Sequence, residues 1–226
     1  MKESKVSVVI PTLNEEKNLP IVLKDLESLN CIKEILIVDG HSKDKTVDIA
    51  KKHCCKILYD DKGKGSALRV GMHAAKGEVI VNMDADCSMT ANEILLLKAG
   101  IDAGYDICMG SRFIQGGGTE DMPLIRKFGN KFFVFLVNLF WGMNYSDLCY
   151  GYRAFSKSVV GKLNLKRDGF GIETELSIKA AKKNLRVLEV PSFEKSRIHG
   201  QGNLRTFGDG WNILKTIFSE LFNNEK

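Results

Sequence analysis

The feature that most constrains the fold is an apolar run, Val79-Ile80-Val81, that is followed by two aspartates one residue apart, Asp84 and Asp86. The three apolar residues are consecutive, which is typical of a strand buried on both faces. In parallel α/β sheets, ligands bind beyond the carboxyl ends of the strands, where both carboxylates would lie. Because Mg²⁺ and Mn²⁺ prefer oxygen ligands, the pair predicts a divalent metal site. A solvated turn is the alternative interpretation.

Three more apolar segments precede this run and alternate with helical patterns. The predicted strands are 6–10, 34–38 and 56–59, and the predicted helices run from Asn14 as the capping residue to about Leu29, from Asp44 onward, and from Ser66 to about Ala75. This order predicts an α/β fold with a mostly parallel twisted sheet, flanked by helices on right-handed crossovers. Gly63 and Gly65 form only a weak dinucleotide fingerprint, because the third glycine is absent and the loop follows the third strand.

The composition is that of an ordinary globular protein. The 226 residues suffice for a sizeable core, and 44% of them are hydrophobic and 27% charged. No apolar run reaches the roughly 18 residues of a membrane span. Residues 1–5 lead straight into a strand, so we expect an intracellular chain without a signal peptide. The six cysteines form no C-x-x-C pair and are predicted to be reduced thiols.

The formal net charge of +5 is unevenly distributed. Residues 1–121 are close to balanced, whereas the region from Arg126 to Arg205 is rich in lysine and arginine. This asymmetry predicts an anionic partner for the second half, such as a phosphorylated lipid or a membrane surface. Nucleic acid is not favoured, because no aromatic residues are interleaved along a basic stripe.

Several motifs between residues 6 and 205 carry a family resemblance. The first half contains Val-Val-Ile-Pro-Thr-Leu-Asn-Glu (8–15), Val-Asp-Gly-His-Ser-Lys-Asp-Lys-Thr (38–46), Lys-Gly-Lys-Gly-Ser-Ala (62–67) and Asp-Ala-Asp (84–86). These motifs resemble the nucleotide-sugar domain of inverting, GT-A-fold glycosyltransferases of family 2. The second half adds Gly-Ser-Arg-Phe (110–113), Arg-Lys (126–127), Asp-x-x-x-Gly-Tyr-Arg-Ala-Phe (147–155), Glu-Val-Pro (189–191) and Arg-x-x-Gly (197–200). The full set is similar to the dolichyl-phosphate (polyprenyl-phosphate) mannosyl- and glucosyltransferases.

The resemblance implies roles for individual residues. The nucleotide sugar would be bound by Pro11, Thr12, Asn14, Glu15, Val38, Asp39, Lys64, Asp84, Ala85 and Asp86. Asp84 and Asp86 would hold Mg²⁺ or Mn²⁺, acting as a Lewis acid on the leaving diphosphate. The acceptor phosphate would be bound by Arg112, Arg126, Arg153 and Arg197, since the arginine fork pairs with phosphate in a bidentate way. The catalytic set is Asp84, Asp86, Arg112 and Arg153.

The implied reaction is an inverting sugar transfer to dolichyl or polyprenyl phosphate from UDP-glucose, UDP-N-acetylglucosamine or GDP-mannose. A family 2 transferase acting on a sugar hydroxyl is the alternative, and Asp147 or Glu173 could then serve as the base. A catalytically silent binding module is a third interpretation, which intact Asp84, Asp86 and Arg153 disfavour. This chain departs from the family at Val38, where a second aspartate is usual, and at Cys87-Ser88-Met89, which puts an additional metal ligand in doubt.

Two apolar stretches, 132–141 and 211–222, are too short to span a bilayer and suit its interface. Core packing or a homodimer seam is the alternative for both. The resemblance implies one GT-A domain over 1–205, with a nucleotide-sugar half (1–112) and a partly helical acceptor half (113–205), followed by an amphipathic helix at 206–226. We therefore expect a protein peripheral to the cytoplasmic face of a membrane.

Overall fold

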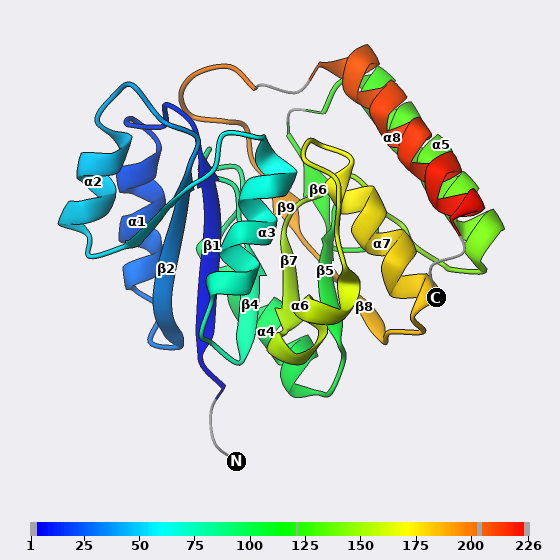
Figure 1. Ribbon diagram of the computed structural model, residues 1–226, viewed down its shortest axis with the longest axis horizontal. Coiled ribbons are helices and arrows are strands. Elements are labelled where there is room, and N and C mark those ends of the chain that lie inside the picture. The colour runs from blue at the N-terminus through cyan, green and yellow to red at the C-terminus, as the bar shows by residue number, and fades with distance from the viewer. Residues whose placement is uncertain (1–3, 121, 203–204, 224–226) are drawn as a thin grey trace.

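The computed structural model describes residues 4–120, 122–202 and 205–223 (Figure 1). The strands are β1 (Val6–Thr12), β2 (Ile32–Asp39), β3 (Lys56–Tyr59), β4 (Val79–Asn82), β5 (Ile107–Ser111), β6 (Gly118–Thr119), β7 (Arg153–Ser156), β8 (Val187–Pro191) and β9 (Phe193–Glu194). The helices are α1 (Leu19–Glu27), α2 (Thr46–Lys52), α3 (Lys64–Ala74), η1 (Ala91–Glu93), α4 (Ile94–Asp102), α5 (Leu124–Trp141), α6 (Lys157–Leu163), α7 (Ile172–Lys182) and α8 (Thr206–Phe222).

Seven strands form one sheet in the order β3-β2-β1-β4-β7-β5-β8, and β6 pairs with β9 in a second, small sheet. All pairs in the large sheet are parallel except those of β7, which runs antiparallel to both β4 and β5. The predicted mostly parallel α/β fold is therefore confirmed. Because β7 is reversed, its first residue, Arg153, pairs with Asn82 near the carboxyl end of β4.

The sheet is covered on both faces, which explains the consecutive apolar residues in its central strands. Side chains of one face, such as Val8 and Val81, pack with α1, α2 and α4. Those of the other face, such as Val9 and Ile80, pack with α3, α6 and α7 and with parts of α5 and α8. Every residue of β4 is buried, as the consecutive apolar residues Val79-Ile80-Val81 predict.

The first helix starts later than the sequence predicts. Asn14 does not cap it, because Asn14 has a left-handed backbone (φ 56°) and its Oδ1 accepts a hydrogen bond from Lys43 N at 2.8 Å. The next residue, Glu15, donates its backbone N–H to Thr46 Oγ1 at 2.8 Å. The segment after β1 is therefore a loop fastened to the loop after β2, and α1 begins only at Leu19.

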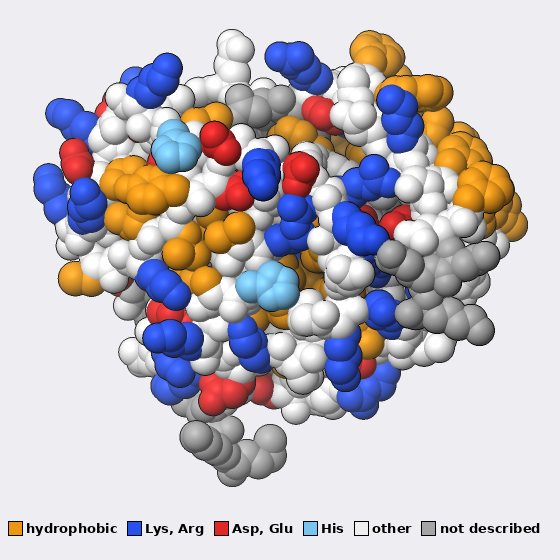
Figure 2. All heavy atoms as spheres, viewed as in Figure 1, with side chains coloured by type: hydrophobic (Ala, Val, Ile, Leu, Met, Phe, Trp, Pro, Cys, Tyr) orange, Lys and Arg blue, Asp and Glu red, His pale blue; other side chains and the backbone are white. Residues whose placement is uncertain are grey.

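Helices α5 and α8 pack against each other on the far side of α7 from the sheet (Figure 1). Their outward surface is strongly apolar. The exposed residues of this surface include Leu124, Phe128, Phe135, Leu139, Phe218 and Phe222. We call this surface the apolar helix face, and Figure 2 shows it along the right-hand edge. Across the described ranges, no helix combines the length and apolar character needed to cross a bilayer.

Candidate functional site

A cleft of about 1040 Å³ lies at the carboxyl edge of the sheet. Loops after β1 to β4 line one end, and α5, α8 and the segment 195–202 line much of the rest. Further lining residues are Arg112, Met122, Cys149, Tyr150, Gly151, Phe170, Glu173 and Glu194. This is the position that the sheet topology predicts for a ligand site. The predicted site residues that line the cleft are Pro11, Thr12, Glu15, Val38, Lys64, Asp84, Ala85, Asp86, Arg112, Arg126 and Arg197.

Asn14, Asp39 and Arg153 are not among the lining residues. Asp39 is fully buried, and its carboxylate accepts hydrogen bonds from Thr12 Oγ1 at 3.1 Å and from Ser42 Oγ at 2.6 Å. It also accepts the Ser42 backbone N–H at 2.8 Å. Through these contacts the side chain organises the turn after β2, and its predicted contact with the nucleotide stays a prediction.

Asp84 lies in an ion cluster with Lys64 and Glu173. Lys64 Nζ is 2.9 Å from Asp84 Oδ1 and 3.2 Å from Glu173 Oε1. Burial raises the pKa of Asp84 above its ordinary value, although Lys64 favours the ionised carboxylate. Against the opposing effect of burial, Asp84 and Glu173 raise the pKa of Lys64, so the lysine stays protonated. Glu173 thus joins the site through Lys64.

Two glycines place Lys64 at this position. Gly65 donates its N–H to the Asp168 carbonyl at 2.7 Å, and a Cβ on Gly65 would lie 2.4 Å from the Arg167 carbonyl oxygen. Gly63 has φ +125°, a conformation that L side chains rarely adopt. The Lys-Gly-Lys-Gly motif therefore packs closely against another backbone segment and directs the second lysine into the cleft.

Asp86 is held by different partners. Its Oδ1 accepts hydrogen bonds from Ser88 N at 3.1 Å and Ser88 Oγ at 2.6 Å. Its Oδ2 lies 3.1 Å from Arg197 Nη2, while Arg197 Nη1 contacts Glu15 Oε1 at 3.0 Å. Against the opposing effect of burial, Glu15 and Asp86 raise the pKa of Arg197. Each strand-end aspartate is thus paired with a cationic side chain, Asp84 with Lys64 and Asp86 with Arg197.

The donor set at the strand end suits a divalent cation. Within the described ranges, no group of three or more His, Cys, Asp or Glu side chains is placed to hold a metal. Mg²⁺ typically takes one or two protein carboxylates and completes its shell with substrate phosphates and water. Asp84 and Asp86 line the same cleft and supply these two carboxylates. A nucleoside diphosphate could provide the remaining oxygens.

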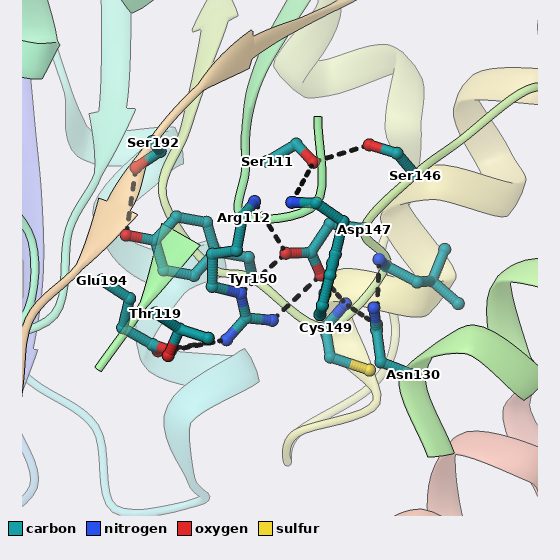
Figure 3. A network of polar contacts seen from close by, with 12 residues as sticks. Ser111, Arg112, Thr119, Asn130, Ser146, Asp147, Cys149, Tyr150, Ser192 and Glu194 are labelled. Carbon is teal, nitrogen blue, oxygen red and sulfur yellow. Dashed lines mark hydrogen bonds and ion pairs between the residues drawn. The ribbon is translucent and has the colours of Figure 1, made fainter. Parts of the chain in front are cut away.

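Arg112 is the centre of a polar network in the cleft wall (Figure 3). Its Nε and Nη2 donate to the two oxygens of Asp147 at 2.7 and 2.9 Å, and its Nη1 donates to Glu194 at 3.0 Å. The Tyr150 ring lies 4.6 Å from the guanidinium. Against the opposing effect of burial, Asp147 and Glu194 raise the pKa of Arg112. Its charge is neutralised by two carboxylates, which favours a structural role over the predicted phosphate contact.

Arg153 is 1% exposed and bonded entirely within the protein. Its Nε donates to the Tyr150 carbonyl at 2.9 Å, its Nη2 to the Leu148 carbonyl at 2.8 Å, and its Nη1 to the Glu173 carbonyl at 2.9 Å. Burial lowers its pKa from the usual value. These contacts give Arg153 a structural role, and its predicted part in acceptor binding and catalysis stays a prediction. The residue joins the loop before β7 to the start of α7.

Asn130 is a cleft residue that the sequence analysis missed. Its Oδ1 accepts the backbone N–H groups of Leu148 and Cys149, both at 3.1 Å (Figure 3). Its Nδ2 is buried and has no hydrogen-bond partner among the described residues. Asn130 lies one helical turn after Arg126 on α5, and both line the cleft. A polar residue within the largely apolar sequence of α5 is the signal from which Asn130 could have been predicted as a site residue.

The opposite end of the cleft is largely apolar. Arg126 Nε donates to Thr206 Oγ1 at 3.1 Å, which links the first turns of α5 and α8. Apolar residues of both helices then continue the lining, namely Ile125, Phe132, Phe133, Phe207, Trp211, Ile213 and Leu214. The cleft therefore joins a charged end beside β4 to an apolar end between two helices.

Comparisons with known proteins identify the family of this chain. Residues 7–163 match the family model described as Glycosyl transferase family 2. A dolichol-phosphate mannosyltransferase of Pyrococcus furiosus is 35% identical over 229 residues, which cover 96% of this chain and 62% of that protein. A polyprenol monophosphomannose synthase of Mycolicibacterium smegmatis is 29% identical over 229 residues, which cover 93% and 83%.

A solved structure supports the same fold. Glucosyl-3-phosphoglycerate synthase from Mycobacterium tuberculosis, in complex with Mn²⁺, UDP and glucosyl-3-phosphoglycerate, has a TM-score of 0.77 at 19% identity. The match covers 96% of this chain and 80% of that one, and it identifies the fold as GT-A. With the family model matched over most of its length, this chain belongs to glycosyl transferase family 2.

Proposed function

We propose that the protein transfers a sugar, with inversion, from a nucleoside diphosphate sugar to a polyprenyl phosphate such as dolichyl phosphate. The observation that carries this proposal is the shape of the cleft. One end presents Asp84, Asp86 and Lys64, and the other is walled by apolar side chains of α5 and α8. A donor diphosphate suits the first end and the hydrocarbon of a lipid acceptor suits the second.

The named relatives support this choice of acceptor. Proteins called dolichol-phosphate mannosyltransferase and dolichyl-phosphate hexose transferase match 96% and 94% of this chain. Their names do not identify the donor of this chain. The candidate donors that we propose are UDP-glucose, UDP-N-acetylglucosamine and GDP-mannose. The glucosyl-3-phosphoglycerate synthase is named for a different product and supports only the fold.

The residues suggest how the reaction would proceed. A phosphate monoester is largely dianionic at neutral pH, so the acceptor needs positioning more than deprotonation. We propose that Arg126 and the unpaired Asn130 amide orient its phosphate. An acceptor oxygen then attacks the anomeric carbon as the bond to the diphosphate breaks. Asp84 and Asp86 would hold Mg²⁺ or Mn²⁺, which as a Lewis acid stabilises the leaving diphosphate, and Lys64 adds a second cation.

Transfer to a sugar hydroxyl would require a carboxylate base. Asp147 is fully buried and paired with Arg112 through both oxygens, so it is unsuited to that role. Glu173 lines the cleft, but its Oε1 is already paired with the Lys64 ammonium at 3.2 Å. The structure therefore favours a phosphate acceptor over a hydroxyl.

An acceptor comparison tests the proposal. With one donor and Mn²⁺, the protein is offered a short polyprenyl phosphate, the matching polyprenol and a soluble phosphate monoester. We expect product only from the polyprenyl phosphate. Equal transfer to the polyprenol would show that the phosphate is not the nucleophile, and equal transfer to the soluble monoester would show that the apolar end of the cleft is not used.

Replacing Arg126 should impair acceptor use selectively. We expect Arg126→Gln to raise the acceptor KM about tenfold or more, since a hydrogen bond to a charged group contributes ~1.5–3 kcal/mol. Donor affinity, measured by calorimetry, should change little. Arg126→Lys should restore activity only in part, because lysine lacks the bidentate fork. Lys127→Gln, one residue away and outside the cleft lining, is the control. Equal effects of Arg126→Gln and Lys127→Gln would contradict the assignment.

We also propose that the apolar helix face attaches the protein to a membrane surface. The triple variant Phe128→Gln, Phe135→Gln and Phe222→Gln should lower co-sedimentation with liposomes, because these rings are 67%, 60% and 80% exposed and would enter the bilayer interface. The matched control is Leu95→Gln with Leu96→Gln on α4, where both side chains are 48% exposed. Unchanged sedimentation of the triple variant would contradict membrane attachment through this face.

A further inference from the structure

The segment 195–202, which leads from β9 towards α8, crosses the carboxyl edge of the sheet and lines the cleft; we call it the strap. It is fastened to two loops of the donor end. Lys195 donates its N–H to the Ser88 carbonyl at 2.9 Å. His199 donates its N–H to Asn18 Oδ1, and Asn18 Nδ2 donates to the His199 carbonyl, both at 3.1 Å. Arg197 lies between these two attachments.

The guanidinium of Arg197 binds the Asp86 oxygen that Ser88 does not contact. Asp86 Oδ1 already accepts two hydrogen bonds from Ser88, whereas Oδ2 is paired with Arg197 Nη2 at 3.1 Å. A divalent cation approaching Oδ2 would meet a positively charged group in hydrogen-bond contact with the same atom. Two cations at that separation repel each other strongly in a partly buried site, so both cannot keep Oδ2 as a close ligand.

We propose that Arg197 is an exchangeable counter-ion of Asp86, which neutralises the carboxylate before a divalent cation binds and is displaced from Oδ2 when it does. Glu15 provides the pivot for this movement. Its Oε1 contacts Arg197 Nη1 at 3.0 Å, and its Oε2 is fixed by Asn18 Nδ2 at 2.6 Å. Arg197 can therefore leave Asp86 while its other nitrogen stays paired.

The displaced guanidinium gains an anionic partner in the same cleft. With Asp86 occupied by the cation, the freed Arg197 nitrogen faces the space that the diphosphate or the acceptor phosphate would fill. This part of the inference rests on the proposed function, whereas the exchange itself concerns only the protein and the metal. Arg197 would thereby contact the anionic substrates only after the metal is in place.

Metal affinity tests the exchange without measuring transfer. Mn²⁺ alone is titrated into the full chain and followed by electron paramagnetic resonance. Arg197→Gln should bind Mn²⁺ about tenfold more tightly than wild type, because the competing cation is absent; a tenfold change corresponds to ~1.4 kcal/mol. Arg197→Lys should lie between the two, since lysine keeps the charge but loses the fork.

The control is Lys195→Gln, which removes the same charge from the strap without removing a contact to Asp86. It should leave the Mn²⁺ affinity within about twofold of wild type. Equal affinities for wild type, Arg197→Gln and Arg197→Lys would overturn the exchange, as would an equal gain in Lys195→Gln, which would indicate a general charge effect. Tighter Mn²⁺ binding by Arg197→Gln in a protein that transfers no sugar to polyprenyl phosphate would support the exchange and refute the proposed function.

Discussion

Replacing Asp86 with asparagine is expected to lower the rate of sugar transfer at least about 100-fold while changing the thermal unfolding midpoint little. The metal at a leaving group supplies several kcal/mol of transition-state stabilisation, and each 1.36 kcal/mol corresponds to a factor of ten in rate. Asparagine can keep the hydrogen bonds that Ser88 donates to Oδ1. It replaces Oδ2 with an uncharged amide, so the proposed cation would lose one of its two carboxylates.

The measurement is the initial rate of transfer in the presence of Mn²⁺, together with a calorimetric unfolding scan. Asp25→Asn on α1 removes the same charge outside the cleft lining and should retain the wild-type rate. Wild-type protein should lose activity in EDTA and regain it when Mn²⁺ is added back. Full activity of Asp86→Asn in EDTA-treated buffer would exclude a metal role for this residue.

Arg153→Ala is expected to act on stability. The side chain is 1% exposed and donates to the carbonyls of Leu148, Tyr150 and Glu173 and to Ser177 Oγ at 2.8–2.9 Å. Each buried acceptor left unpaired costs ~1–3 kcal/mol, so the free energy of unfolding should fall by about 3 kcal/mol or more. Arg153→Lys should recover only part of this loss, because a single ammonium cannot reach acceptors on several sides.

Urea unfolding followed by circular dichroism measures this effect. Arg186→Ala serves as the control, because its side chain is 68% exposed and its Nε lies 3.5 Å from Asp106, and exposed pairs contribute ~0–1 kcal/mol. If Arg153→Ala were as stable as wild type but bound the acceptor poorly, the ligand role implied by the family resemblance would be restored. Wild-type stability together with wild-type activity would exclude both roles.

The first four strands were predictable because each apolar run is followed by a polar loop. The sequence analysis did not predict β5, β7 and β8, which complete the sheet. The run that ends in Asp84 and Asp86 identified β4 correctly, and both aspartates line one cleft with Lys64 and Glu15. The role of Asp39 in the turn after β2 was harder to predict. A carboxylate before a glycine, Asp39-Gly40, suits either a ligand or a turn, and its contacts with Thr12 and Ser42 show that it organises the turn.

The arginines show the limit of motif reasoning. A sequence cannot reveal what surrounds a guanidinium, and the four predicted phosphate ligands prove to have different surroundings. Arg153 is enclosed by carbonyls and Arg112 by two carboxylates, whereas Arg197 pairs with Asp86 and Arg126 contacts α8. Arg153 is buried because it is the first residue of the reversed strand β7, where it pairs with Asn82 of the central strand β4. Long-range pairing of this kind leaves no local signal.

Product analysis with lipid acceptor tests the central claim most directly. The wild-type protein is incubated with Mn²⁺, a short polyprenyl phosphate and, in separate reactions, UDP-glucose, UDP-N-acetylglucosamine and GDP-mannose, and the lipid fraction is examined by mass spectrometry. We predict that one donor increases the mass of the polyprenyl phosphate by a single sugar residue, with the anomeric configuration inverted. Failure of every donor with polyprenyl phosphate, together with transfer to a sugar hydroxyl, would contradict the proposed function.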